Sequence, residues 1–125
     1  MIKITDYMTR PVITAKPTDT IRAVVAKMDH YNIGSLVVMS AKKIVGIVTE
    51  RDVIRKAIAR KMDLEKVTVA RIMTTNVQTV RVTGSLIEVA SIMKSHSMRR
   101  IVVIDKSGKP VGVVTSKDLI DILCT

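Results

Sequence analysis

Residues 8–52, MTRPVITAKPTDTIRAVVAKMDHYNIGSLVVMSAKKIVGIVTERD, recur as residues 73–118, MTTNVQTVRVTGSLIEVASIMKSHSMRRIVVIDKSGKPVGVVTSKD. The offset between matching residues is 65 at the first methionine and 66 at the last aspartate, so the second copy gains one residue near Ser107 and Gly108. A repeat with a fixed spacing defines the structural unit of a chain. Two copies predict a pair of units that bury one face against each other and carry two related clefts.

Both copies predict the element order β-α-β-β-α. The first copy predicts strands at 12–14, 36–39 and 44–48, a helix at 21–31 and a closing helix at 50–61. The second copy predicts strands at 77–79, 101–104 and 111–114, a helix at 86–96 and a closing helix at 116–123. Apolar residues recur every three or four positions in the first helix of each copy, which is typical of one face packed on a core.

Composition indicates a small protein with an aliphatic core. Of 125 residues, 47% are hydrophobic, yet Phe and Trp are absent, so the core is expected to consist of Val, Ile, Leu and Met. No apolar run reaches the roughly 18 to 20 residues of a membrane helix, and the start of the chain lacks the apolar block of a signal peptide. Cys124 is the only cysteine, which excludes an intrachain disulfide. We therefore expect a cytoplasmic protein without a membrane partner.

The net charge of +10 favours an anionic partner, such as a nucleotide, a nucleic acid or an acidic protein. A basic stripe on the first closing helix is compatible with nucleic-acid binding; its members are Arg55, Lys56, Arg60 and Lys61. Against that alternative, the chain has almost no aromatic residues on which single-stranded bases stack. A basic nucleic-acid-binding protein and a purely structural dimerisation module both remain as alternatives.

Each copy closes with hydrophobic-Gly-hydrophobic-hydrophobic-Thr-x-x-Asp, as GIVTERD at 46–52 and GVVTSKD at 112–118. A threonine before a helix start followed three residues later by an acid is typical of a capping box. The same carboxylate can accept both hydroxyls of a ribose, while the helix start offers donors to a phosphate. The pattern alone leaves both roles open, and they can coexist.

These closing motifs, the Met-Thr pairs at Met8 and Met73, and the element order resemble a tandem pair of CBS (cystathionine-β-synthase) domains over practically the whole chain. The resemblance implies an α/β (α+β) fold of two pseudo-twofold related β-α-β-β-α units packed through their sheets. Repeat 1 is expected at 1–62 and repeat 2 at 63–125, together in one compact module. It also implies a non-catalytic sensor of adenosine compounds (AMP, ADP, ATP or S-adenosylmethionine) that forms a homodimer and is read by a regulated protein partner.

In this family each cleft combines the Thr-x-x-Asp motif of one copy with the first strand and hairpin entrance of the other. For the first cleft the resemblance implies Thr49, Asp52, Val77, Gln78, Arg99, Arg100 and Lys117. For the second it implies Thr115, Asp118, Val12, Ile13, Ile33, Gly34, Ser35 and Arg51. Because guanidinium groups bind phosphate bidentately, the cleft facing Arg99 and Arg100 is expected to bind a phosphorylated adenosine more tightly.

Metal binding and catalysis are not expected from the remaining residues. His30 and His96 do not align in the repeat, and no Cys-x-x-Cys or His-x-x-x-His spacing occurs. No Ser-His-Asp order, nucleophile turn or phosphate-binding glycine loop is present. We therefore predict neither an enzyme nor a required cofactor.

Overall fold

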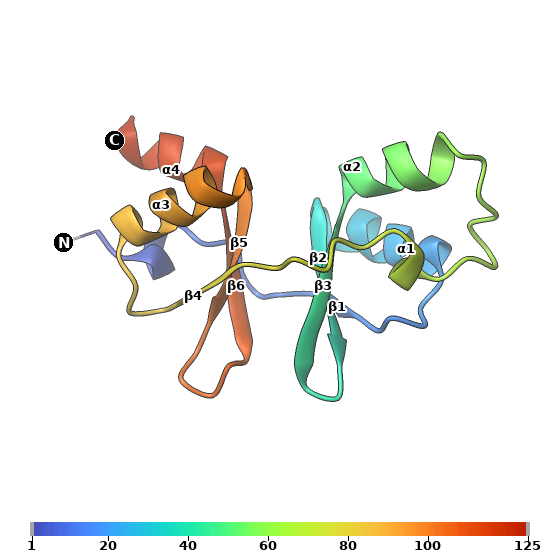
Figure 1. Ribbon diagram of the computed structural model, residues 1–125, viewed down its shortest axis with the longest axis horizontal. Helices are drawn as coiled ribbons and strands as arrows, with labels where there is room; N and C mark the ends of the chain where they lie inside the picture. Colours follow the sequence, from blue (N-terminus) through green and yellow to red (C-terminus); the bar gives the residue numbers. More distant parts are fainter. Residues whose placement is uncertain (1, 125) are drawn as a thin grey trace. The chain divides into compact units, whose positions relative to one another are not determined.

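The computed structural model describes residues 2–124, which form two three-stranded sheets with helices packed on one face of each (Figure 1). The described chain separates into two compact units. The central unit is Ile13–Val77. The terminal unit contains the rest of the described chain, so the segment up to Val12 lies with the elements that follow Gln78.

The central unit contains the first copy of the repeat. Its strands are β1 (Thr14–Ala15), β2 (Ser35–Ser40) and β3 (Lys43–Thr49). They form a sheet in the order β1-β2-β3, with β1 parallel and β3 antiparallel to β2. Its helical segments are α1 (Ile21–Tyr31), α2 (Glu50–Asp52), the π-helical turn η2 (Val53–Ile58) and the 3-10 turn η3 (Val69–Arg71).

The terminal unit repeats this arrangement. Its strands β4 (Thr79–Arg81), β5 (Arg100–Ile104) and β6 (Pro110–Thr115) form a sheet in that order, with β4 parallel and β6 antiparallel to β5. Its helical segments are the 3-10 turn η1 (Ile4–Asp6), α3 (Leu86–His96) and α4 (Ser116–Leu123). The predicted α+β class and the order β-α-β-β-α are thus confirmed in both copies.

The first helix of each copy begins and ends where local sequence chemistry predicts. Thr20 Oγ1 accepts a hydrogen bond from the backbone N–H of Ala23 at 3.1 Å, and Ser85 Oγ accepts one from Glu88 at 3.1 Å. The residues after the helices, Asn32 and Ser97, have left-handed φ values of 53° and 51°, which ends each helix.

Three predicted elements have other bounds in the structure. The opening strands lie two residues later than 12–14 and 77–79, because pairing with the next strand sets them, Thr14 opposite Val37 and Thr79 opposite Val102. The first closing helix is regular only over Glu50–Asp52. It continues as the π-helical turn η2, in which the Ala59 N–H donates to the Ile54 carbonyl at 2.9 Å.

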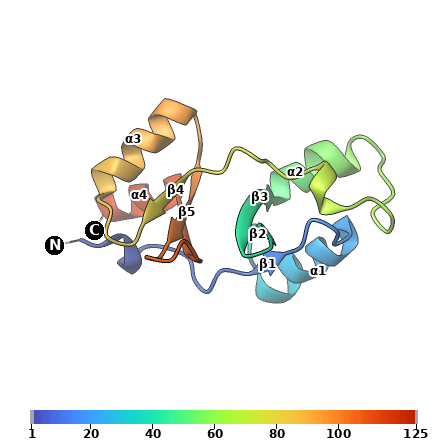
Figure 2. The ribbon, with the colours of Figure 1, turned by 60° about the horizontal axis from the view of Figure 1, so that its bottom comes forward.

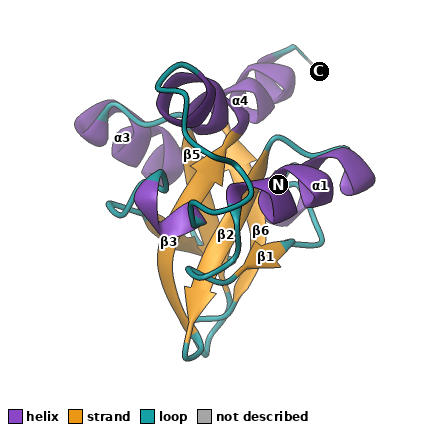
Figure 3. Ribbon diagram, turned by 90° about the vertical axis from the view of Figure 1, so that its right-hand side faces the viewer, coloured by secondary structure: helices purple, strands orange, loops and turns teal. Residues whose placement is uncertain are grey.

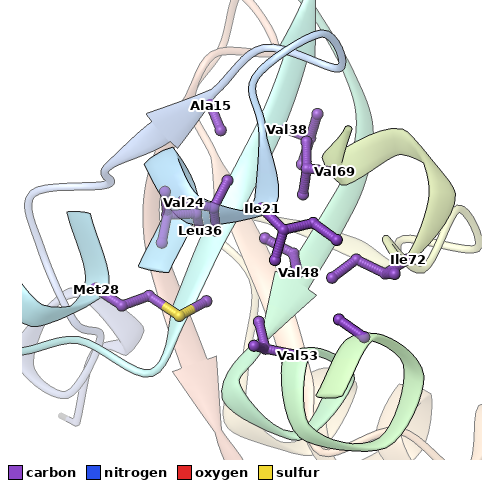
Figure 4. Packing of buried hydrophobic residues seen from close by; sticks show 11 residues of the cluster. Ala15, Ile21, Val24, Met28, Leu36, Val38, Val48, Val53, Val69 and Ile72 are labelled. Atoms are coloured by element: carbon purple, nitrogen blue, oxygen red, sulfur yellow. The ribbon is translucent and has the colours of Figure 1, made fainter. Parts of the chain in front are cut away.

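An aliphatic core fills the space between the sheet and helices of the central unit. Ile21 and Val24 of α1 lie against Leu36 and Val48 of the sheet, as Figure 4 shows. The segment after η2 closes this core with two residues that are 0% exposed, Val69 and Ile72. The terminal unit has an equivalent aliphatic core built around Val89 of α3 and the sheet.

Each copy's Met-Thr pair packs on the return strand of the other copy. Thr74 and Ile47 exchange backbone hydrogen bonds at 2.8 and 2.9 Å within the central unit. Thr9 and Val113 do the same at 2.8 and 3.1 Å within the terminal unit. The linker segment 69–74 therefore belongs to the central unit, and the chain then runs on to β4 (Figure 2). The repeat boundary at 62/63 describes the duplicated sequence and stays a prediction.

The two β-hairpins turn differently, and each turn projects past the helices of its unit (Figure 3). The first uses Ala41 and Lys42, whose φ values are 50° and 66°. The second is longer, and Asp105 Oδ1 accepts hydrogen bonds from the backbone N–H of Lys109 and from the hydroxyl and N–H of Ser107 at 2.8–2.9 Å. The Ser107 hydroxyl, followed by the Lys109 N–H, holds the pKa of the Asp105 carboxyl below its usual value.

Candidate ligand-binding site

Both Thr-x-x-Asp motifs form capping boxes at the end of a return strand. Thr49 Oγ1 accepts from the Asp52 N–H at 3.1 Å, and Asp52 Oδ2 accepts from the Thr49 N–H at 3.0 Å. Thr115 and Asp118 make the same two bonds at 3.2 and 2.8 Å. The predicted capping role is therefore confirmed in both copies. Because Oδ2 of each carboxylate serves the cap, Oδ1 is the oxygen through which a ligand hydroxyl would bind.

The environment of this second oxygen differs between the copies. Asp52 Oδ1 lies 3.2 Å from the Lys56 ammonium, and the Asp52 side chain is only 12% exposed. Asp118 uses Oδ2 for its cap in the same way. The position that matches Lys56 is Ile122, whose side chain carries no charge. One carboxylate is thus charge-compensated by a lysine of its own unit, whereas the matching position in the other copy carries an uncharged side chain.

Strand register places each motif beside the hairpin entrance of its own copy. Ser35 is paired with Thr49, and the Glu50 N–H donates to the Gly34 carbonyl at 3.0 Å. In the terminal unit Arg100 is paired with Thr115. There the Ser116 N–H donates to the Arg99 carbonyl at 2.8 Å. Gly34 and Ser35 therefore flank the first motif, and the two arginines flank the second. The cross-copy grouping implied by the family resemblance concerns contacts between units and stays a prediction.

The remaining candidates occupy equivalent places in the two copies. The Ile13 carbonyl accepts from the Val37 N–H at 3.2 Å, and the Gln78 carbonyl accepts from Val102 at 3.0 Å. Ile13 and Gln78 therefore lie directly before the opening strands β1 and β4. Val12 and Val77, one residue earlier in each copy, are half-buried. Ile33 packs against the core of the central unit. Arg51 and Lys117 are exposed on the first helical turn of their motifs.

A groove of about 380 Å³ lies between the end of α1 and the start of α2 in the central unit. Gly34 forms part of it, and its apolar wall includes Val25 and Val53. Two exposed carboxylates, Asp29 and Glu50, line it as well. Because like charges repel, this groove disfavours a phosphate.

No group of three or more His, Cys, Asp or Glu side chains among residues 2–124 is arranged to hold a metal ion. None of the helices described is both long enough and apolar enough to cross a membrane.

Lys56 is the residue that the sequence analysis did not assign to the site. The sequence predicts Lys56 as a member of a basic stripe, whereas the structure pairs it with Asp52 and with the carbonyl of Ile72. Its spacing of four residues from Asp52 is the signal that predicts a helical ion pair. The contact with Ile72 joins residues sixteen positions apart, and no local sequence pattern predicts it.

The repeated units and their capped Thr-x-x-Asp motifs define a tandem pair of small α+β domains. The chain belongs to the CBS domain family, whose model matches residues 4–59 and again residues 69–124. The resemblance seen in the sequence is thereby confirmed.

Relatives and solved structures agree with this assignment. YlbB from Bacillus subtilis is 37% identical over 122 residues, which cover 95% of this chain and 80% of that protein. An uncharacterized protein from Methanopyrus kandleri is 31% identical over 97% of this chain, and the chain spans 62% of its length.

Two similar solved structures contain adenosine compounds. A CBS domain pair in complex with 5′-methylthioadenosine and S-adenosyl-L-methionine matches with a TM-score of 0.84 and 30% identity, covering 98% of this chain and 96% of that one. A CBS domain protein from Pyrobaculum aerophilum complexed with AMP matches with a TM-score of 0.82 and 28% identity, covering 99% and 100%.

Proposed function

We propose that this chain is a non-catalytic regulatory module that binds an adenosine compound through the Thr-x-x-Asp motif of each copy. The observation that carries the proposal is the duplicated capping box. It holds a carboxylate at a helix start and leaves Oδ1 facing away from the cap bond. A ribose diol donates hydrogen bonds to such an oxygen, and bonds of this charge-assisted kind are the stronger ones.

The fold family supports the choice of an adenosine compound. AMP and S-adenosyl-L-methionine occur in solved CBS domain structures that cover nearly all of this chain. A net charge of +10 raises the local concentration of any phosphorylated ligand. In this proposal the ligand shifts the protein between states that a regulated partner distinguishes, in a homodimer of the module.

We assign the phosphate contacts to the site of the terminal unit. Arg100 is paired with Thr115 in the sheet, so its guanidinium group starts from the strand position beside Asp118. Arg99 adjoins it, and its carbonyl is bonded to the helix start. Paired guanidinium groups bind phosphate bidentately. The site of the central unit is flanked by Gly34 and Ser35 in place of arginines. It should therefore also bind AMP, with a lower affinity.

Calorimetric titration with AMP, ADP, ATP and S-adenosylmethionine tests the proposal. Asp52→Asn and Asp118→Asn keep an oxygen for the cap but remove the charge. Each should therefore weaken one binding event about tenfold or more, since a hydrogen bond to a charged group contributes about 1.5–3 kcal/mol. Asp121→Asn is the matched control. Asp121 lies on α4, the helix that also carries Asp118, but it is exposed and lies outside the motif.

Arg100→Ala then decides between the two groupings. If Arg100 binds the phosphate of the ligand held by Asp118, Arg100→Ala should abolish the AMP binding that remains in the Asp52→Asn variant. It should leave the AMP binding that remains in the Asp118→Asn variant unchanged. The opposite pattern would support the cross-copy grouping. Absence of binding by all four ligands to the unsubstituted protein, together with tight binding of RNA or DNA in a gel shift, would overturn the proposed function in favour of nucleic-acid binding.

A further inference from the structure

We propose that Lys56 is a positioning residue that couples ligand occupancy at Asp52 to the linker segment 69–74, which lies in the central unit shortly before the chain leaves it after Val77. The proposal rests on the proposed function for the nature of the ligand. Its structural basis lies within the central unit, where one ammonium group contacts both the candidate ligand-binding carboxylate and the linker.

The Lys56 ammonium bridges two elements. Its Nζ lies 3.2 Å from Asp52 Oδ1 and donates to the Ile72 carbonyl at 3.1 Å. The Lys56 side chain is 37% exposed, so its aliphatic stem is largely covered. An ammonium group has three donors, and two of them are used by these contacts. Lys56 therefore holds the carboxylate and the linker at the same time.

The carbonyl that Lys56 binds belongs to a helical end. Ile72 follows the 3-10 turn η3 and is itself 0% exposed. Carbonyl groups at the end of a helical turn lack partners within that turn, and a lysine nearby can bind them. The next residues continue the attachment, since Met73 lies over Gly46 and Thr74 pairs with Ile47. Lys56 thus adds a side-chain contact to the backbone hydrogen bonds that attach this segment, which begin with the Val69 N–H donating to the Asp19 carbonyl at 2.8 Å.

This arrangement is specific to the first copy. Lys56 lies in the π-helical turn η2, whereas the second copy continues as the regular helix α4 with Ile122 at the matching position. Single π-helical turns occur frequently at functional sites. Within residues 2–124, the first copy therefore adds a charged side chain beside its motif, where the second copy has Ile122.

A ligand hydroxyl that donates to Asp52 Oδ1 shares that oxygen with Lys56. Binding then redistributes the ammonium between Asp52, the ligand and the Ile72 carbonyl, and the attachment of segment 69–74 changes. If the ligand changes the affinity of a partner for this segment by some factor, then binding of that partner changes the affinity of the site for the ligand by the same factor.

Amide hydrogen exchange measured by mass spectrometry tests this coupling, with AMP as the probe. Lys56→Met removes both contacts of the ammonium. We expect roughly fivefold faster exchange across 69–74, as for loss of a partly exposed charged hydrogen bond. Arg55→Met is the matched control, because it removes one positive charge from the same turn at an exposed position. In the unsubstituted protein and in Arg55→Met, AMP should alter exchange across 69–74. In Lys56→Met it should not.

Ligand-free measurements keep this test separate from the proposed function. Asp52→Asn should raise the rate of amide exchange across 69–74 even without AMP, since it removes the charge that attracts the Lys56 ammonium. Lys56→Arg, which retains the charge, covers the case in which Lys56→Met fails to fold, and it should keep the AMP response. Failure of AMP to bind would contradict only the proposed function. Unchanged exchange across 69–74 in both Lys56→Met and Asp52→Asn, or a persisting AMP response in Lys56→Met, would overturn the coupling.

Discussion

At the scale of single residues, the glycine in each return strand makes room for a methionine from the other copy. A Cβ atom at Gly46 would lie 2.6 Å from Met73 Sδ and 3.1 Å from the Thr74 carbonyl oxygen. Gly112 meets Met8 in the same way in the terminal unit. A glycine inside a strand often marks a close approach of another segment, and the packing of both Met-Thr pairs provides that approach here.

Gly46→Ala should lower the free energy of unfolding by about 1–3 kcal/mol, the usual cost of overpacking. Chemical denaturation measures this loss. In a Met73→Ala background the same substitution should cost clearly less, because the thioether that it displaces is gone. An equal cost in both backgrounds would show that Met73 is not the source of the clash.

At the scale of elements, the two β-hairpins have turns of different length and backbone conformation. Ala41 and Lys42 both adopt positive φ, which suits a two-residue turn but disfavours residues with a Cβ. The extra residue of the second copy allows Gly108 to take the positive φ, 88°, while Asp105 binds the turn. The first hairpin is therefore the more strained of the two.

Lys42→Gly should raise the free energy of unfolding by about 1 kcal/mol, because glycine adopts left-handed φ without a steric cost. Thermal melting checks the direction. The comparison variant is Lys106→Gly, in the turn of the second copy at a residue without positive φ, which should not stabilise. Destabilisation by Lys42→Gly would mean that the lysine side chain contributes more than the turn geometry costs.

At the scale of the whole molecule, two capped motifs of the same design differ in their surroundings. The Lys56 ammonium compensates Asp52, whereas Arg99 and Arg100 flank the motif of Asp118. If the proposed function holds, these local differences would give the two motifs different ligands, or different affinities for the same ligand.

A ligand that binds only the folded module raises its stability by mass action, by about 2.7 kcal/mol at a concentration of 100 times Kd. We expect AMP or S-adenosylmethionine to raise the melting temperature by several degrees. Inorganic phosphate at equal ionic strength is the control for general anion binding to a basic protein. An equal rise with phosphate would contradict recognition of the adenosine part.

Sequence patterns were sufficient for the features that depend on neighbours along the chain. The repeat, the bounds of both first helices and the capping boxes follow from apolar periodicity and from Thr and Asp three positions apart. Long-range pairing governs the rest. The opening strands shift to match β2 and β5, and the Met-Thr pairs complete the opposite copy's unit. Lys56 reaches Ile72 only because the folded linker lies against η2. Those contacts join residues far apart in sequence, so no local pattern encodes them.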